Sequence, residues 1–120
     1  MKRCAIASVA LAALLGASGA LAHAFLDHAI PAVGGKVAAS PPEIAVWFTQ
    51  DLEPAFSGLR VEDAAGRTVA AAERAVDPSA PAVLRLPLPT LAPGRYRVVW
   101  HALSIDSHKT EGDFTFEVAP

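Results

Sequence analysis

Alternating hydrophobic and polar residues divide most of this chain into short extended segments. Residues 44–49 are apolar on both parities, which indicates a strand that is covered on two sides. Alternation and short apolar runs together predict strands at residues 44–49, 59–62, 68–70, 82–88, 95–102 and 113–118. Six or seven short strands in fewer than a hundred residues predict an all-β fold, an Ig-like β-sandwich.

Turn residues separate the predicted strands. Turns are expected at Asp63-Ala64-Ala65-Gly66 and at Leu91-Ala92-Pro93-Gly94. Tyr96 follows the second turn at the start of a late strand, which is the position of the tyrosine corner in Greek-key sandwiches. Its hydroxyl is therefore expected to bond back to the turn. The alanine-rich residues 70–75 could instead form a helix, which Asp77-Pro78 would end.

The start of the chain has the three parts of a secretory signal peptide. Lys2 and Arg3 form a basic start, residues 4–15 are an almost unbroken apolar run, and Ala20-Leu21-Ala22 supplies the small residues that a signal peptidase requires. A membrane anchor is the alternative. The apolar stretch is short for a bilayer span, however, and glycine and serine residues interrupt its end.

Cleavage after Ala22 would leave His23 as the first residue of the mature protein. Cleavage after Ala20 is the alternative, and it would leave Leu21 first. We therefore expect a signal peptide at residues 1–22 and a single domain at residues 23–120, exported and without a membrane span after cleavage.

The composition of residues 23–120 narrows the possible partners and ligands. Eight Lys and Arg residues oppose twelve Asp and Glu residues, which gives a net charge of −4 and disfavours a nucleic-acid partner. The only cysteine, Cys4, and the only methionine, Met1, lie in the signal peptide. The mature domain therefore has no disulfide, no thiol nucleophile and no sulfur ligand for a metal.

Motifs of common enzyme classes are missing from the sequence. The serines do not lie in a Gly-x-Ser-x-Gly elbow, and there is no Gly-x-x-x-x-Gly-Lys loop for phosphate. Asp51 and Glu53 could act as an acid–base pair on a sugar, but a solvated turn closed by Pro54 explains them better. We therefore expect a protein that is not an enzyme.

Asp106-Ser107-His108 is the strongest candidate for chemistry. In an extended chain, residues two apart point the same way and lie roughly 6.5 to 7 Å apart, so that the carboxylate and the imidazole could converge on one ion. The segment lies in a polar loop between the strands predicted at 95–102 and 113–118. The pattern is weak by itself, and its position between two strong strands favours a metal site.

A mature His23 would complete this set of ligands. Its free amine and its imidazole can close a chelate ring on one metal ion, and Asp106 and His108 add an oxygen and a nitrogen. Nitrogen and oxygen donors in a tetragonal arrangement suit Cu(II), whereas Cu(I) prefers sulfur. The predicted metal ligands are therefore His23, Asp106 and His108, with one Cu(II) per chain and no Cu(I) site.

Five segments of the sequence carry a family resemblance: His23-Ala24-Phe25-Leu26, Ala29-Ile30-Pro31-Ala32, Val46-Trp47-Phe48-Thr49, Leu91-Ala92-Pro93-Gly94-Arg95-Tyr96, and Val98 to Lys109 with its Trp-x-x-x-Ser-x-Asp-x-His pattern. Together they resemble the CopC family of periplasmic copper-binding proteins. The resemblance implies a Greek-key β-sandwich and Cu(II) held by the terminal histidine, Asp and His. It also implies copper handling beside a CopD-type inner-membrane protein, in copper homeostasis or resistance.

The chain departs from the family pattern at several positions. It has no methionine-rich loop for Cu(I), and Phe25 stands where some members have a second histidine. Some members carry an acidic residue after the first buried strand, where this chain has Gln50 followed by Asp51. The contribution of either residue to the site is left open.

Two further histidines and two other functions remain as alternatives. His28 and His101 are more readily explained as structural histidines, and the parity of His101 places it on the opposite side of its strand from Trp100. A copper histidine-brace oxygenase would use a similar amine and imidazole, but Asp106 stands where oxygen needs an open position. A metal-free Ig-like interaction module is the other alternative.

Overall fold

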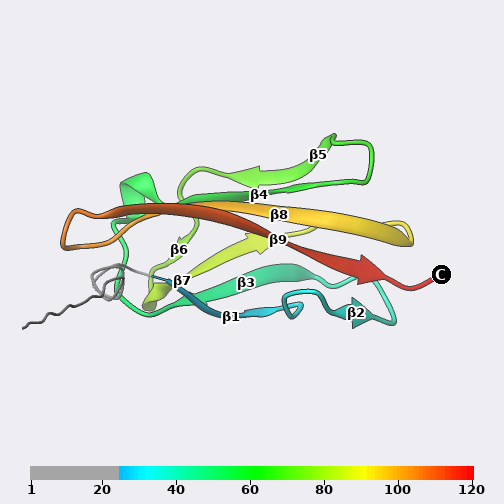
Figure 1. Cartoon of the computed structure of the whole chain (residues 1–120), viewed down its shortest axis with the longest axis horizontal. Coiled ribbons are helices and arrows are strands. Elements are labelled where there is room, and N and C mark those ends of the chain that lie inside the picture. Colours follow the sequence, from blue (N-terminus) through cyan, green and yellow to red (C-terminus); the bar gives the residue numbers. More distant parts are fainter. Residues whose placement is uncertain (1–24) are drawn as a thin grey trace, which may run out of the picture.

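Two β-sheets lie face to face and enclose the core of the protein (Figure 1). The structure is a computed structural model, and it describes residues 25–120. The four-stranded sheet has the order β1 (Leu26–Ile30), β3 (Glu43–Phe48), β7 (Ala80–Pro87) and β6 (Val76–Asp77). The five-stranded sheet has the order β2 (Lys36–Val37), β9 (Lys109–Val118), β8 (Gly94–Leu103), β4 (Gly58–Glu62) and β5 (Thr68–Ala72). The 3₁₀ helix η2 (Pro54–Phe56) precedes β4.

Strands that are distant in the sequence pair within each sheet. β3 pairs antiparallel with β7, and β4 pairs antiparallel with β8, so that the chain crosses between the sheets. The fold is the expected Ig-like Greek-key β-sandwich. Within residues 25–120, seven strands have five residues or more, and β2 and β6 have two each.

All six strands expected from the sequence are confirmed, with small changes at their ends. The alternative of a helix at residues 70–75 is wrong, because residues 68–72 form β5, which is paired with β4. The sequence pattern missed β1, since Asp27 and His28 interrupt its apolar positions. No helix within residues 25–120 is both long enough and apolar enough to cross a bilayer.

β8 supplies much of the core through its alternate residues. Val98 and Ala102 are buried between the sheets, and Trp100 is only 8% exposed, which confirms the inward face of this strand. The Tyr96 hydroxyl donates a hydrogen bond to the carbonyl oxygen of Ala92 at 2.6 Å, as expected of a tyrosine corner. Across the hairpin, a Cβ on Gly112 would lie 2.7 Å from the Trp100 ring, so that this position requires glycine.

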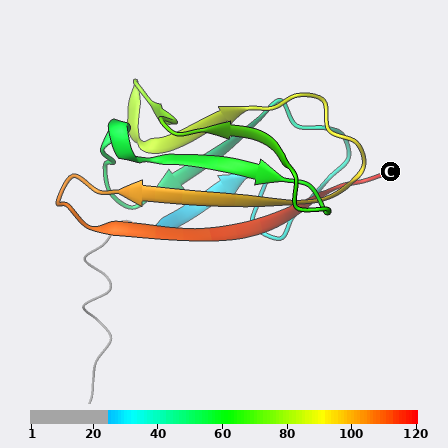
Figure 2. The same ribbon diagram turned by 90° about the horizontal axis from the view of Figure 1, so that it is seen from above.

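The long β8–β9 hairpin positions the candidate site. Its register is unbroken from Gly94 opposite Val118 to Leu103 opposite Lys109, and a short loop of residues 104–108 joins the two strands. This loop lies at the same end of the sandwich as the beginning of β1 and the 3₁₀ helix η2 (Figures 1 and 2). Ten paired positions therefore provide a rigid support for the loop.

Candidate metal centre

Ser104 holds the loop between β8 and β9 in shape. It is fully buried, and its backbone N–H donates to the carbonyl oxygen of His108 at 3.0 Å. Ser107 donates its N–H to the Ser104 carbonyl oxygen at 2.9 Å and has a positive φ of 74°. The N–H of His108 also reaches the Ser104 hydroxyl oxygen, at 3.3 Å. The loop is therefore a turn that is closed by hydrogen bonds between Ser104 and residues 107 and 108.

Asp106 and His108 converge in this turn. The distance between Oδ1 of Asp106 and Nδ1 of His108 is 3.2 Å, and both side chains are a little less than half exposed. The expectation of an extended chain at Asp106-Ser107-His108 is wrong, because Ser104 closes the chain into a turn. Side chains two residues apart still meet, since the turn and the positive φ of Ser107 bring them to one side.

The Asp106 carboxylate is held in its charged form. The Ser104 hydroxyl donates a short hydrogen bond to Oδ1, which lowers the pKa of Asp106 below its ordinary value, and the His108 ring and backbone lower this pKa further. A carboxylate that is ionised at neutral pH is available to a cation without the loss of a proton. The family pattern contains this serine, but its role as a hydrogen-bond donor was not recognised from the sequence.

A second segment, residues 49–53, lies beside the loop. Leu52 forms an isolated antiparallel bridge with Ser104, and the Glu53 N–H donates to the Leu103 carbonyl oxygen at 2.7 Å. The carbonyl oxygen of Asp51 accepts the N–H of Ile105 at 3.2 Å. Asp51 thus supports the loop through its backbone, while its side chain is exposed to solvent.

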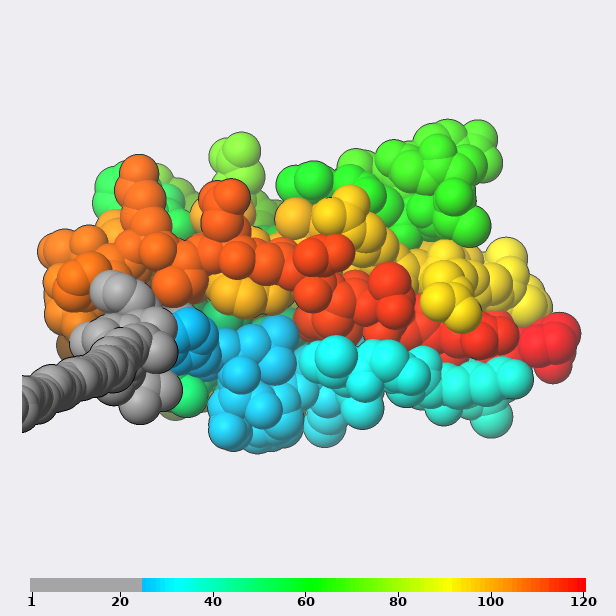
Figure 3. All heavy atoms as spheres, in the orientation of Figure 1, coloured from blue at the N-terminus to red at the C-terminus, as the bar shows by residue number. Residues whose placement is uncertain are grey.

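The beginning of the described chain joins the same group of segments. The Phe25 N–H donates to the Thr49 hydroxyl oxygen at 2.9 Å, and the Thr49 N–H donates to the Phe25 carbonyl oxygen at 2.9 Å. Thr49 is the first residue of the segment 49–53, which lies beside the loop. On the surface, the start of β1 and the β8–β9 loop occupy the same end of the molecule (Figure 3). The predicted ligand His23 precedes Phe25 by two residues and lies outside the described residues.

The other two histidines lie away from the β8–β9 turn. His101 projects from the outer face of the five-stranded sheet, directly across from Glu111 in β9, as its parity predicts. His28 stacks on Trp47 with ring centroids 4.4 Å apart, and its Nδ1 lies 2.8 Å from Oδ2 of Asp27. The side-chain contacts of His28 are with Trp47 and Asp27, and His101 lies on the face of β8 opposite to Trp100 and Ala102.

Asp106 and His108 are the candidate metal-donor side chains that the turn brings together. Within residues 25–120, no group of three or more His, Cys, Asp or Glu side chains is arranged to hold a metal ion. Asp106 and His108 form a pair of one oxygen and one nitrogen donor. The prediction of His23 as a further ligand concerns a residue outside this part of the chain.

Comparison with known proteins agrees with this architecture. The sequence model of the CopC domain matches residues 26–119. The chain is 36% identical to Protein YobA of Escherichia coli (strain K12) over 98 residues, which is 81% of this chain and 79% of YobA. It is 30% identical to copper resistance protein C of Pseudomonas syringae pv. tomato over 126 residues, which is 98% of both chains.

Solved structures show the same fold. CopC from Methylosinus trichosporium OB3b matches with a TM-score of 0.73 and 37% identity, over 82% of this chain and 95% of that chain. PcoC, a methionine-rich copper resistance protein from Escherichia coli, matches with a TM-score of 0.70 and 29% identity, over 80% of this chain and 98% of PcoC. The fold and these relatives define a β-sandwich of the copper resistance class. The chain belongs to the CopC family.

Proposed function

We propose that this protein is a periplasmic Cu(II) carrier or buffer. In this proposal, signal peptidase cleaves after Ala22, and the new amine and imidazole of His23 bind one Cu(II) together with Asp106 and His108. The observation that carries the proposal is the pairing of Asp106 and His108 on a rigid turn. The turn lies at the same end of the sandwich as the beginning of β1, which follows Phe25 (Figure 1).

The distance between the two described donors fits one metal ion. Two donor atoms at adjacent corners of a square, each about 2 Å from the ion, lie about 2.8 Å apart, and a wider angle increases this distance. Oδ1 of Asp106 and Nδ1 of His108 are 3.2 Å apart. Small side-chain rotations therefore suffice for both atoms to bind the same ion.

Chain length supports the contribution of His23. Phe25 is tied to Thr49 by two hydrogen bonds, and Thr49 leads into the segment that holds the turn. Two residues span at most about 7 Å, so the mature amino terminus cannot lie far from Phe25. Its amine and imidazole need no other element of the fold to bring them to this end of the molecule.

The donor types favour Cu(II) over Cu(I). The set contains nitrogen and oxygen donors, and the only sulfur atoms of the chain belong to Met1 and Cys4, which precede the proposed cleavage site. PcoC is a methionine-rich protein, and this chain differs from it in having methionine only at residue 1. Copper must displace the proton of the terminal amine, so that affinity is expected to fall as the pH decreases.

The surroundings of the turn are suited to a protein partner. Phe56 and Ile105 are 62% and 60% exposed, although both are large and apolar, and both belong to the same end of the sandwich. An apolar surface beside a metal site allows a partner to exclude water while copper is transferred. A CopD-type inner-membrane copper protein is the partner that we propose.

The amino terminus provides the decisive test. Protein isolated from the periplasm should begin at His23 by intact mass and Edman sequencing, and its Cu(II) complex should show nitrogen hyperfine splitting in the EPR spectrum. A variant with one extra alanine before His23 has the same imidazole but a displaced amine. It should bind Cu(II) at least tenfold more weakly, because the chelate ring is lost. A mature start at another residue, equal affinity of the extended protein, or the absence of Cu(II) binding would contradict the proposal.

A further inference from the structure

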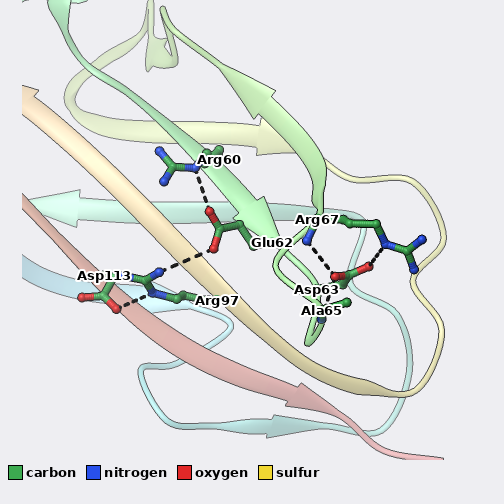
Figure 4. Close-up of polar contacts among 7 residues, drawn as sticks. All are labelled: Arg60, Glu62, Asp63, Ala65, Arg67, Arg97 and Asp113. Carbon is green, nitrogen blue, oxygen red and sulfur yellow. Dashed lines mark hydrogen bonds and ion pairs between the residues drawn. The ribbon is translucent and has the colours of Figure 1, made fainter.

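Eight of the twelve carboxylate side chains in residues 25–120 have an arginine, lysine or histidine partner, and four do not. Figure 4 shows three of the paired carboxylates, Glu62, Asp63 and Asp113, beside their arginines. The four that take part in no ion pair within residues 25–120 are Asp51, Glu53, Glu73 and Glu111. Their negative charges therefore have no direct cationic partner in this part of the chain.

These four carboxylates lie at the end of the sandwich that carries the β8–β9 turn. Two of them belong to the segment 49–53, which forms a bridge with Ser104 of the turn. The other two, Glu73 and Glu111, line a hollow together with the end of the hairpin next to the turn. Unpaired negative charge therefore gathers beside the candidate metal centre, whereas the other carboxylates of the described chain are paired.

The hollow opens on the outer face of the five-stranded sheet and has a volume of about 490 Å³. Its lining comes from η2, from Glu73 and from the ends of β8 and β9 beside the turn (Figure 1). Ala55, Ala102 and Leu103 contribute apolar surface, and the lining residue Phe56 is 62% exposed. Ligand sites usually have volumes of roughly 300–1,000 Å³. The hollow is therefore large enough to receive side chains of another molecule.

Gly58 allows the chain at Glu73 to approach β4 closely. A Cβ on Gly58 would lie 2.3 Å from the carbonyl oxygen of Ala72 and 2.8 Å from Cα of Glu73. Gly58 lies opposite His101 of β8, and His101 lies opposite Glu111 of β9. The backbone at Glu73 and the exposed side chains of His101 and Glu111 thus form one line across the outer face. Because close backbone packing holds one carboxylate and paired strands hold the other, the hollow is preformed.

The lining combines apolar surface with an excess of negative charge. Lys109 is the one cation among the lining residues, against the carboxylates of Glu73 and Glu111, and the segment 49–53 adds two more carboxylates nearby. A basic group would offset this charge, and an apolar side chain would cover the exposed ring of Phe56. An anionic lipid surface would be repelled. The chemistry of the hollow therefore favours a partner with basic and apolar side chains next to each other.

We propose that this hollow is a docking site for a basic segment of a partner protein, in which an arginine or lysine adjoins an apolar side chain. Glu73 and Glu111 contact the basic group, and Phe56 contacts the apolar one. The proposal rests on the proposed function in one respect, namely that this partner exchanges copper with the protein. Leu103 and Lys109 of the lining are the last paired residues before the turn, so that docking brings the partner beside the candidate metal centre. Docking itself requires no copper.

Titration with short peptides in the presence of a metal chelator tests the proposal. The peptide acetyl-Gly-Arg-Leu-Arg-Gly-amide should bind the exported protein with a dissociation constant on the order of 1 mM. In ¹H–¹⁵N NMR spectra it should shift the amide signals of the lining residues 55–56, 73, 101–103 and 109–111. Replacement of its leucine by glycine should weaken binding about fivefold, since apolar contact is lost. Replacement of both arginines by glutamates should abolish binding, because like charges repel.

Matched variants separate the hollow from general charge effects. Glu73→Gln/Glu111→Gln should weaken binding of the arginine peptide about fivefold, and Phe56→Ser about threefold. Glu43→Gln/Glu117→Gln removes the same charge from paired carboxylates and should leave binding unchanged. Equal losses in the two double variants, equal binding of the arginine and glutamate peptides, or signal shifts confined to residues outside the hollow would overturn the proposal.

Two other occupants of the hollow are outcomes of the same experiment. Shifts of the lining signals with protein concentration alone would identify a second copy of the chain, and binding to vesicles of anionic phosphatidylglycerol through these residues would identify a membrane. Either result would overturn the proposal. Copper binding is measured separately. Protein that binds Cu(II) but no peptide contradicts the docking site alone, and protein that binds the peptide but no Cu(II) contradicts the proposed copper function alone.

Discussion

Carboxylates on the outer face of the five-stranded sheet and the carboxylate of Asp106 have different kinds of partners. On the outer face, Glu62 contacts Arg60 at 3.0 Å and Arg97 at 3.5 Å, and Arg97 also contacts Asp113 at 2.7 Å (Figure 4). Asp106 instead accepts a hydrogen bond from the neutral Ser104 hydroxyl and lies beside His108. Glu62 and Asp113 are thus paired with guanidinium groups, whereas the partners of Asp106 are Ser104 and His108.

This difference favours Asp106 over the paired outer-face carboxylates as the proposed metal ligand. Arginine stays protonated at all ordinary pH values, so that it neutralises its carboxylate permanently and offers no lone pair to a cation. A hydroxyl lowers the pKa of Asp106 without adding positive charge, and a neutral imidazole is itself a metal ligand. The turn thus combines an ionised carboxylate with a second donor, whereas the outer face forms a closed network of ion pairs.

Removal of the donors should have the largest effect. Asp106→Ala and His108→Ala should each lower Cu(II) affinity roughly a hundredfold or more, since each removes a proposed ligand. Asp113→Ala, from the ion-pair network, should leave affinity within about twofold. Titration against a chromophoric Cu(II) competitor measures all three variants. Equal losses in Asp106→Ala and Asp113→Ala would show that general negative charge, and no particular site, attracts the ion.

Ser104→Ala should have an intermediate effect on copper binding. Loss of the hydroxyl removes hydrogen bonds that position Asp106 and close the turn, so that Cu(II) affinity should fall roughly tenfold. The fully buried Ser57 provides a matched control, because its hydroxyl oxygen accepts the Leu103 N–H at 3.0 Å. Both substitutions should destabilise the fold by about 1–3 kcal/mol in urea titrations. Similar losses of copper affinity in both variants would mean that Ser104 acts only through stability.

The Asp77–Arg85 pair should control acid stability and leave copper binding unchanged. Nε of Arg85 donates to Oδ2 of Asp77 at 2.6 Å, which with bonds from Ser79 lowers the pKa of Asp77 to about 2. The stabilisation from Asp77 is therefore complete above its unfolded pKa near 3.9 and is lost as the pH falls toward 2. Asp77→Asn should be less stable than the unchanged protein at pH 7, and the difference should narrow by pH 2.5. A difference that does not change with pH would contradict this assignment.

The sequence predicted the sheet elements well, because their burial follows a local pattern. The inward residues of β8 alternate without a break, and Tyr96 closes its corner as expected. β1 was missed because its outward Asp27 and His28 are consecutive, which a bulge in its pairing with β3 accommodates. Strand pairing with a distant partner determines this element, and no local pattern records it.

The candidate site was predictable in its residue types but not in its geometry. Asp106 and His108 were identified from their spacing and family pattern, yet the extended chain assumed for them is a turn. The reason lies in Ser104 and in the bridge from Leu52, which depend on tertiary contacts. The hydrogen bonds that tie Phe25 to Thr49 are equally non-local. The participation of His23 stays a prediction, since it lies outside the described residues.

Arg97→Ala should have the smallest effect. Its side chain is half exposed, and pairs between exposed charges contribute little because solvent and salt screen them. The variant should lose less stability than Ser104→Ala, and the loss should shrink further in 1 M NaCl. Cu(II) affinity should be unchanged, since Arg97 lies on the outer face and does not contact the turn in the part of the chain that the structure describes. A clear loss of copper affinity in this variant would show that the ion-pair network and the candidate metal centre are coupled through β8. The separation between the two kinds of carboxylate would then be wrong.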